Sequence, residues 1–389
     1  MTAHPPPTDA GPVQGSARIV SLDLIRGLGV LGILLMNAVS FRFGEAPYFN
    51  LSAGGSETWL DWAVGILGEI FVDQKFMGLF SLLFGAGMIL FIDRASARGR
   101  RAVLLNLWRN ALLLLIGFLH SLLWAGDVLM AYALSSVFLL ALRKLPNRAL
   151  ISLGVAVFML SVVTTFVAQH IADTTDASLA GVWTTGESSG EEAPELLVLL
   201  GFFLRALGLI LAGAGLYRTG FMNGGMPPRT YKLTAIVGLA TGLSLASAGI
   251  IVTAANDYSR EVAFIGQIPN TLGTIPASLG YMGLFILWNN RDDSRLKERL
   301  RAVGRMALTN YLTQTLLGVF VLTTLLADAD SADRAAVLVF VAGVWALQVW
   351  WSQAWLSRFW FGPAEWLWRV ATYRRMQPLR RRGEARTAG

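Results

Sequence analysis

The sequence lacks cysteine altogether and contains only three histidines among its 389 residues. Without cysteine, the chain forms neither disulfide bonds nor thiolate metal sites. His4 lies near the start of the chain and His170 at the end of an apolar run, so His120 alone lies within such a run. One histidine does not make a histidine-rich metal site. We therefore expect no bound metal and no resident cofactor.

Conventional catalytic motifs are also absent. The sequence has no His-Glu-x-x-His zinc motif and no Gly-x-Ser-x-Gly nucleophile elbow. The glycine-rich stretches at 84–88 and 211–216 precede no Gly-Lys-Ser or Gly-Lys-Thr, so neither is a phosphate loop.

Charge is scarce. Charged residues make up only 15% of the chain and hydrophobic residues 54%, and the mean hydropathy is +0.54. Soluble domains carry about 25% charged residues. Because the deficit extends along the whole length, the composition predicts an all-α polytopic integral membrane protein.

Ten apolar runs have roughly the length needed to cross a bilayer core about 30 Å thick. They cover 20–41, 73–92, 108–125, 128–142, 149–169, 196–216, 232–254, 270–288, 307–326 and 335–357. The third and fourth are short and joined by Ala-Gly-Asp, which predicts a tight hairpin. Residues 59–72 are apolar but include Asp61 and Glu69, which favours an interfacial or re-entrant helix after the first span.

The two ends of the chain differ from the middle. Residues 1–17 are rich in Pro, Gly, Ala and Thr, which predicts a disordered cytoplasmic tail. They lack the basic start and compact apolar core of a signal peptide, so we expect the first span to be retained. We expect one transmembrane helical domain over 18–372, followed by a basic cytoplasmic tail over 373–389.

Basic residues gather in alternate loops, and acidic residues in the loops between them, above all in an outer loop over 170–195. The basic set is Arg94, Arg98, Arg100, Arg101, Arg143, Lys144, Arg148, Arg218, Arg229, Lys232, Arg291, Arg295, Lys297, Arg299 and Arg301. An excess of Lys and Arg marks the cytoplasmic side, so we expect both termini inside and an even number of spans. The formal charge of +7 then reflects loops that contact lipid headgroups, which argues against nucleic acid as a partner.

His120 and Asp127 lie seven positions apart in an otherwise apolar segment. A carboxylate that accepts a hydrogen bond from one imidazole nitrogen fixes the tautomer and makes the other nitrogen a better base. Ionisable groups within a membrane are functional candidates, so we predict that this pair is catalytic. A purely structural pair is the alternative, and the break at Gly126 leaves contact between the side chains open.

Six further polar residues within or beside the apolar runs are candidates for substrate binding: Asp23, Arg26, Asn37, Lys75, Asn310 and Gln314. The pair Asp23–Arg26 is one helical turn apart, and each could equally fix its helix through an ion pair. Lys75 could snorkel or pair with a nearby carboxylate, and amides often tie membrane helices together.

Packing signals are weaker. Gly238, Gly242 and Ala246 recur at four-residue spacing, which permits close helix approach and is compatible with a homodimer. Near the end, Glu365 precedes Arg369 by four residues, which predicts a surface pair on an interfacial amphipathic helix.

Five segments together resemble the YeiB-like family of bacterial inner-membrane proteins. They are RIVSLDLIRGLGVLGILLMNAVSF, QKFMGLFSLLFGAGM, GFLHSLLWAGDVLMAYAL, GRMALTNYLTQTLL and GPAEWLWRVATY. The resemblance spans almost the whole chain and implies a multi-pass protein of the cytoplasmic membrane.

The first span, with its Leu-Asp-x-x-Arg-Gly motif, is similar to the opening helix of the membrane acyltransferase superfamily, which includes heparan-α-glucosaminide N-acetyltransferase. That resemblance implies about ten spans and transfer of an acyl group from cytosolic acyl-CoA to a hydroxyl or amine across the membrane. The O-acetyltransferases of this group carry a histidine fourteen residues after the motif aspartate, where this chain has Asn37. His120 is then the remaining intramembrane imidazole.

Three functions follow as hypotheses. The first is an acyltransferase with acyl-CoA as co-substrate and a lipid, glycan or small molecule as acceptor, in which Asn37 or Asn310 stabilises the oxyanion. The second is a proton-coupled transporter or flippase that uses His120, Asp127 and Lys75. The third is a membrane scaffold or sensor without catalysis.

Overall fold

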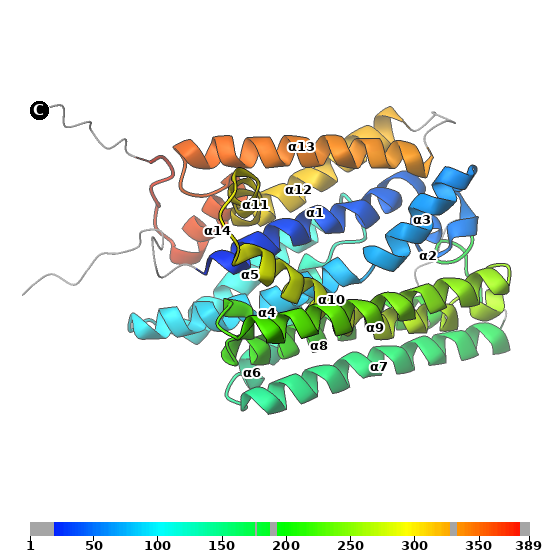
Figure 1. Cartoon of the computed structure of the whole chain (residues 1–389), viewed down its shortest axis with the longest axis horizontal. Coiled ribbons are helices and arrows are strands. Elements are labelled where there is room, and N and C mark those ends of the chain that lie inside the picture. Colours follow the sequence, from blue (N-terminus) through cyan, green and yellow to red (C-terminus); the bar gives the residue numbers. More distant parts are fainter. Residues whose placement is uncertain (1–18, 176, 187–192, 327–332, 382–389) are drawn as a thin grey trace, which may run out of the picture.

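The computed structural model describes residues 19–175, 177–186, 193–326 and 333–381, and this part of the chain is built from helices without a named strand (Figure 1). The α-helices are α1 (Val20–Phe43), α2 (Ala46–Phe49), α3 (Trp59–Phe71), α4 (Lys75–Ala97), α5 (Ala102–Ser121), α6 (Leu129–Leu142), α7 (Asn147–Thr174), α8 (Ala193–Arg218), α9 (Pro228–Ala255), α10 (Ile268–Asn289), α11 (Arg295–Arg305), α12 (Ala307–Gly318), α13 (Arg334–Arg358) and α14 (Pro363–Tyr373).

Nine helical segments within the described residues are long and apolar enough to cross a membrane, and they coincide with nine of the ten expected spans. The chain is therefore a multi-pass membrane protein. The expectation of ten full spans is corrected at 128–142, because α6 has only 14 residues. At about 1.5 Å per residue it is roughly 21 Å long, short of a bilayer core of about 30 Å.

The helix expected after the first span is present as α3, which has 13 residues. Its first turn is closed by a capping box between Thr58 and Asp61. Between α3 and α4 the chain turns at Gln74, whose φ of +60° is in the left-handed region. This break separates α3 from α4 within one long apolar stretch of 39 residues.

The loops that carry most of the arginines lie at one end of the bundle, together with α11 and α14 at the left in Figure 1. We call it the arginine end. The predicted tail over 1–17, residues 187–192 of the acidic loop and residues 382–389 of the basic tail lie outside the described residues.

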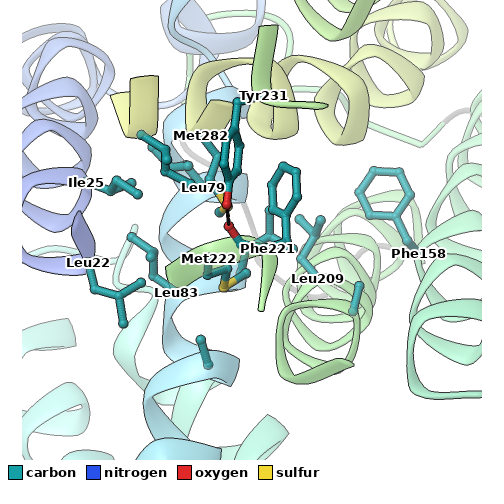
Figure 2. Packing of buried hydrophobic residues seen from close by; sticks show 14 residues of the cluster. Leu22, Ile25, Leu79, Leu83, Phe158, Leu209, Phe221, Met222, Tyr231 and Met282 are labelled. Carbon is teal, nitrogen blue, oxygen red and sulfur yellow. Dashed lines mark hydrogen bonds between the residues drawn. The ribbon is translucent and has the colours of Figure 1, made fainter. Parts of the chain in front are cut away.

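The centre of the bundle is closely packed. In Figure 2, Leu22 and Ile25 of α1 and Leu79 and Leu83 of α4 meet residues from α8 to α10, and the Tyr231 hydroxyl donates a 2.7 Å hydrogen bond to the Phe221 carbonyl. In water, burial of one large apolar side chain stabilises a fold by about 1.5–3 kcal/mol. In a membrane, close packing between the side chains makes the larger contribution to stability.

Small residues set the closest helix contacts. A Cβ on Gly242 would lie 2.5 Å from the Ala277 Cβ, and one on Gly304 would lie 1.8 Å from the Asp23 carbonyl oxygen. The first contact joins α9 to α10, so the face that contains Gly238, Gly242 and Ala246 packs inside this chain. The second joins α11 to α1, at the arginine end.

Candidate functional site

A cavity of about 440 Å³ lies at the arginine end, between α1, α4, α5, α6, α11, α12 and α14. Its volume is within the range of small-molecule sites, about 300–1,000 Å³. Among the described residues, seven arginines and two carboxylates line it, so the cavity carries an excess of positive charge. The charged lining residues are Asp23, Arg26, Arg94, Arg98, Arg100, Arg109, Arg305, Glu365 and Arg369.

The inner part of the cavity is apolar. Val30, Phe84, Leu113 and Leu129 are among the residues that line it, and the hydroxyl-bearing rings of Tyr132 and Tyr311 lie there as well. The cavity is therefore complementary to a ligand with an anionic head and an apolar tail.

Helix α5 connects the two parts. Its buried residues follow one stripe at intervals of three or four: Ala102, Asn106, Asn110, Leu113, Gly117 and His120. From Asn106 to His120 the stripe rises about 21 Å. One helix face thus leads from the arginine end of the cavity towards His120.

Aromatic rings hold several of the cavity arginines in place. The Arg109 guanidinium lies 4.2 Å from the centroid of the Trp368 ring and 4.6 Å from that of Phe91. Arg100 and Arg369 both lie over Tyr373, at 4.9 and 5.1 Å. Contact with an aromatic ring fixes the position of a guanidinium and leaves its positive charge in place, so these contacts position charge without neutralising it.

The predicted Asp23–Arg26 pair is present in the cavity wall, with 3.5 Å between Arg26 Nη1 and Asp23 Oδ1. The Arg26 side chain is 28% exposed and that of Asp23 is 8% exposed. The structure therefore places these two candidates where a ligand in the cavity would meet them.

His120 and Asp127 contact each other across the α5–α6 hairpin, with 2.8 Å between His120 Nδ1 and Asp127 Oδ1. Asp127 lies two residues before α6 and accepts a hydrogen bond from the Met130 N–H at 3.2 Å. A Cβ on Gly117 would lie 2.8 Å from the same Met130 nitrogen, so glycine lets α6 begin this close to α5. The hairpin itself brings the pair together.

Tyr311 of α12 joins this pair to the cavity. Its hydroxyl donates a 3.3 Å hydrogen bond to Asp127 Oδ1, and its ring centroid lies 5.1 Å from that of His120. Tyr311 lines the cavity, whereas His120 does not. His120 Nε2 is buried and has no hydrogen-bond partner in the described part of the chain. The imidazole therefore has one nitrogen fixed by Asp127 and the other unused.

Two asparagines of α5 complete the polar lining. Asn106 is 1% exposed, and neither Nδ2 nor Oδ1 has a partner among the described residues. Asn110 is 5% exposed and donates from Nδ2 to the Asn106 carbonyl at 2.8 Å. A buried polar group without a partner costs about 1–3 kcal/mol, so Asn106 calls for an explanation.

Glu365 departs from the predicted surface pair with Arg369. It lines the cavity and binds the N-terminus of α12, accepting from the Leu308 N–H at 2.7 Å and the Thr309 N–H at 3.0 Å. Burial raises the pKa of the Glu365 carboxyl above its usual value, although the donors of Thr309 oppose that shift. α14 is thereby fixed as part of the cavity wall.

Three candidates lie outside the cavity lining. Asn310 holds α12 against α13, because its Nδ2 donates to Ser352 and its Oδ1 accepts from the Trp351 indole. Gln314 donates from Nε2 to the Gln348 side chain at 2.9 Å. Asn37 lies on α1, partly exposed, and is not part of the cavity wall.

Lys75 also lies elsewhere, in a buried polar network at the α3–α4 break. Its ammonium donates to the Glu69 carbonyl at 2.6 Å and to Asn270 Oδ1. The Asn270 amide in turn donates to Asp73 Oδ2 at 2.8 Å. Because Lys75 is fully buried and bonded within the chain, its position fits the structural alternative.

Two residues of this site are not among the candidates that the sequence indicates. Tyr311 adjoins Asn310 and carries no motif of its own. Asn106 could have been found, because its spacing from Asn110 and His120 puts all three on one helix face. No group of three or more His, Asp or Glu in the described residues is placed to hold a metal ion.

Comparison with known proteins gives relatives over nearly the full length. The chain is 34% identical to the uncharacterised protein YeiB of Escherichia coli K12, over 93% of this chain and 98% of that protein. It is 28% identical to the uncharacterised protein YxaH of Bacillus subtilis 168, over 95% and 97%. An uncharacterised 39.9 kDa protein from Bacillus acidopullulyticus is 27% identical, over 96% and 99%.

The family model described as a protein of unknown function, DUF418, matches residues 216–375, which include α9 to α14. No solved structure matches. The near full-length relationship to YeiB confirms the resemblance inferred from the five segments: the chain belongs to the YeiB-like family of membrane proteins.

Proposed function

We propose that this protein is a membrane-embedded acyltransferase. It takes an acyl group from a cytosolic, acyl-CoA-like donor and passes it to a hydroxyl or amine of a lipid, glycan or small molecule. The observation that carries the proposal is one cavity that leads from seven arginines to Tyr311, which is bonded to the Asp127–His120 pair.

The arginine end faces the cytoplasm in this proposal, because Lys and Arg are retained on that side of a bacterial inner membrane. Donor would then enter from the aqueous phase in which it is made. Its phosphate groups would bind among the guanidinium groups, and its acyl chain would lie against Leu113, Leu129 and their neighbours.

The proposed reaction depends on which nitrogen of the His120 imidazole carries the proton. With the proton of Nδ1 donated to Asp127, the Nε2 lone pair of His120 is free to accept the acceptor's proton. As that O–H or N–H bond breaks, the acceptor atom bonds to the donor's carbonyl carbon and the carbonyl oxygen becomes negative. When the carbonyl re-forms, the carbon–sulfur bond breaks, and the leaving thiolate takes the proton from Nε2.

Access to His120 requires Tyr311 to move, because Tyr311 lines the cavity and the imidazole lies behind that wall. Rotation of Tyr311 away from Asp127 would expose Nε2. It would also release the phenol O–H to donate to the oxyanion, a contribution of about 2.7–4 kcal/mol for a well-placed donor. This assignment replaces the oxyanion roles expected for Asn37 and Asn310.

The similarity of the first span to the acyltransferase superfamily supports the proposal, since Asp23 and Arg26 of its Leu-Asp-x-x-Arg-Gly motif lie in the cavity wall. The test uses purified full-length protein in lipid nanodiscs, acetyl-CoA labelled in the acetyl group, and an extract of bacterial envelope lipids and glycans as acceptor. Label should move to an extractable acceptor with the wild type and not with His120→Ala. Binding without transfer by the wild type would contradict the proposal.

A further inference from the structure

The two asparagines of α5 are not used by the chemistry above. Asn106 is 99% buried, lines the cavity, and has two donor hydrogens and an acceptor oxygen without partners among the described residues. Buried side-chain amides in folded proteins are nearly always hydrogen-bonded. A side-chain amide without hydrogen-bond partners in a cavity wall can bind a polar group of a ligand.

A second asparagine, Asn110, lies one turn further along α5. Its Nδ2 donates to the backbone carbonyl of Asn106 at 2.8 Å, and the residue also lines the cavity. Residues four apart lie on one helix face, so the two amides form a short ladder along the cavity.

The ladder lies between charged and apolar parts of the cavity. Arg98 and Arg100 precede it at the arginine end, Arg109 lies beside it between the two asparagines, and Leu113 follows it at the apolar end. A ligand whose phosphates bind at Arg98 and Arg100 and that reaches towards Tyr311 must therefore pass both amides.

We propose that Asn106 and Asn110 form a subsite for amide groups in the arm that joins the donor's phosphates to its acyl group. A side-chain amide offers both a donor and an acceptor, and is complementary to another amide. This inference rests on the proposed function and narrows it to donors with a pantetheine-type arm. Acyl phosphates and simple lipid phosphates lack such amides and leave the ladder unpaired.

The subsite also predicts selectivity for donors that contain amide groups. A buried site built for hydrogen bonds rejects a ligand that lacks them, because its own polar groups then stay unsatisfied. The arginines alone would bind any polyanion of suitable size. The asparagines add selectivity for a ligand that forms hydrogen bonds with their side-chain amides.

The test compares two ligands on the full-length protein in nanodiscs. Coenzyme A carries the arm, and adenosine 3′,5′-bisphosphate carries phosphates without it. Titration calorimetry of Asn106→Leu and Asn110→Leu should show coenzyme A bound about tenfold more weakly than by the wild type, with the bisphosphate unchanged. Leu107→Ala, on the exposed side of α5, is the matched control and should bind both ligands normally.

The outcomes separate the two proposals. If both asparagine variants bind coenzyme A like the wild type, or lose both ligands in equal proportion, the subsite is wrong while the donor cavity stands. If the wild type binds neither ligand, the proposed donor and the subsite fail together. Thermal unfolding of each variant identifies any that is misfolded, and the remaining asparagine variant then decides.

Discussion

The hydroxyl group of Tyr311 donates a 3.3 Å hydrogen bond to Asp127 Oδ1, the same oxygen that lies 2.8 Å from His120 Nδ1. One carboxylate oxygen therefore links a residue of the cavity wall to a buried imidazole. In the proposed acyltransferase, this link is the reactive end of the cavity and the arginines are the charged end.

Replacing Asp127 by Asn should lower the rate of acyl transfer by about 10²–10⁴-fold, because the imidazole loses the acceptor that fixes its tautomer. Donor affinity should stay near the wild-type value, since Asp127 does not line the cavity. Single-turnover transfer and equilibrium binding on the same sample separate these effects. A full rate in the variant would show that the pair is structural.

Tyr311→Phe keeps the ring and removes only the hydroxyl. We expect transfer to fall by about 10²–10³-fold while coenzyme A binds as before, because the oxyanion loses its donor and the wall keeps its shape. Tyr132→Phe, which also removes a phenol from the cavity wall, is the control. Equal losses in the two variants would argue against a special role for Tyr311.

Arg109→Gln should weaken binding of anionic ligands about tenfold and reduce the dependence of affinity on salt, because one positioned charge is lost. Arg109→Lys should rescue little, since the stacking between Phe91 and Trp368 depends on a planar guanidinium. Arg299→Gln, at an exposed position outside the cavity lining, is the matched control. Salt titrations of coenzyme A affinity check this prediction.

Glu365 predicts a pH dependence. Its carboxyl has a pKa raised by burial, so the folded protein holds this proton at a pH where the unfolded chain has lost it. Its contribution to stability is fully present below the unfolded pKa and is lost as pH rises through the folded pKa. Over the same window the cavity gains a negative charge, so anion affinity should fall as pH rises.

Glu365→Gln holds the side chain neutral and keeps an oxygen to accept from Leu308 and Thr309. The variant should bind coenzyme A more tightly than the wild type above the folded pKa and equally below it. Because titration of the ligand's phosphates affects both proteins alike, the ratio of their affinities isolates Glu365. A ratio independent of pH would contradict the assignment.

Lys75→Met should destabilise the fold by about 3–5 kcal/mol, because it leaves the buried network at the α3–α4 break without its cation. The folded fraction should still bind coenzyme A with wild-type affinity, since Lys75 lies outside the cavity lining. Lys144→Met, at an exposed loop position, should leave stability unchanged. Loss of binding without loss of stability would restore Lys75 as a substrate contact.

The helices could be predicted because a long run of apolar residues indicates a helix that crosses a membrane. The run at 128–142 matches α6 to within one residue, and the error was to count it as a full span, because a helix of 14 residues is too short to cross the bilayer core. The contact between His120 and Asp127 could be anticipated from spacing, because the two residues flank one short hairpin.

The rest of the site depends on contacts between helices that are far apart in the sequence. Such contacts could not be predicted from one sequence. Tyr311 reaches Asp127 from a helix 184 residues further along the chain. Likewise, Asn310 and Gln314 look like recognition groups until α13 supplies their partners Ser352 and Gln348. Whether an intramembrane amide binds a ligand or a neighbouring helix is decided by the helix that happens to face it.

The central claim is that phosphate-headed acyl donor lies in the cavity with its reactive carbonyl at Tyr311 and His120. A density map of the protein with a non-hydrolysable acetyl-CoA analogue in nanodiscs tests it most directly. The account predicts phosphate density among Arg100, Arg109 and Arg369 and the acyl end against Tyr311. An empty cavity at saturating analogue, or the analogue bound with its acyl end towards the arginines, would contradict it.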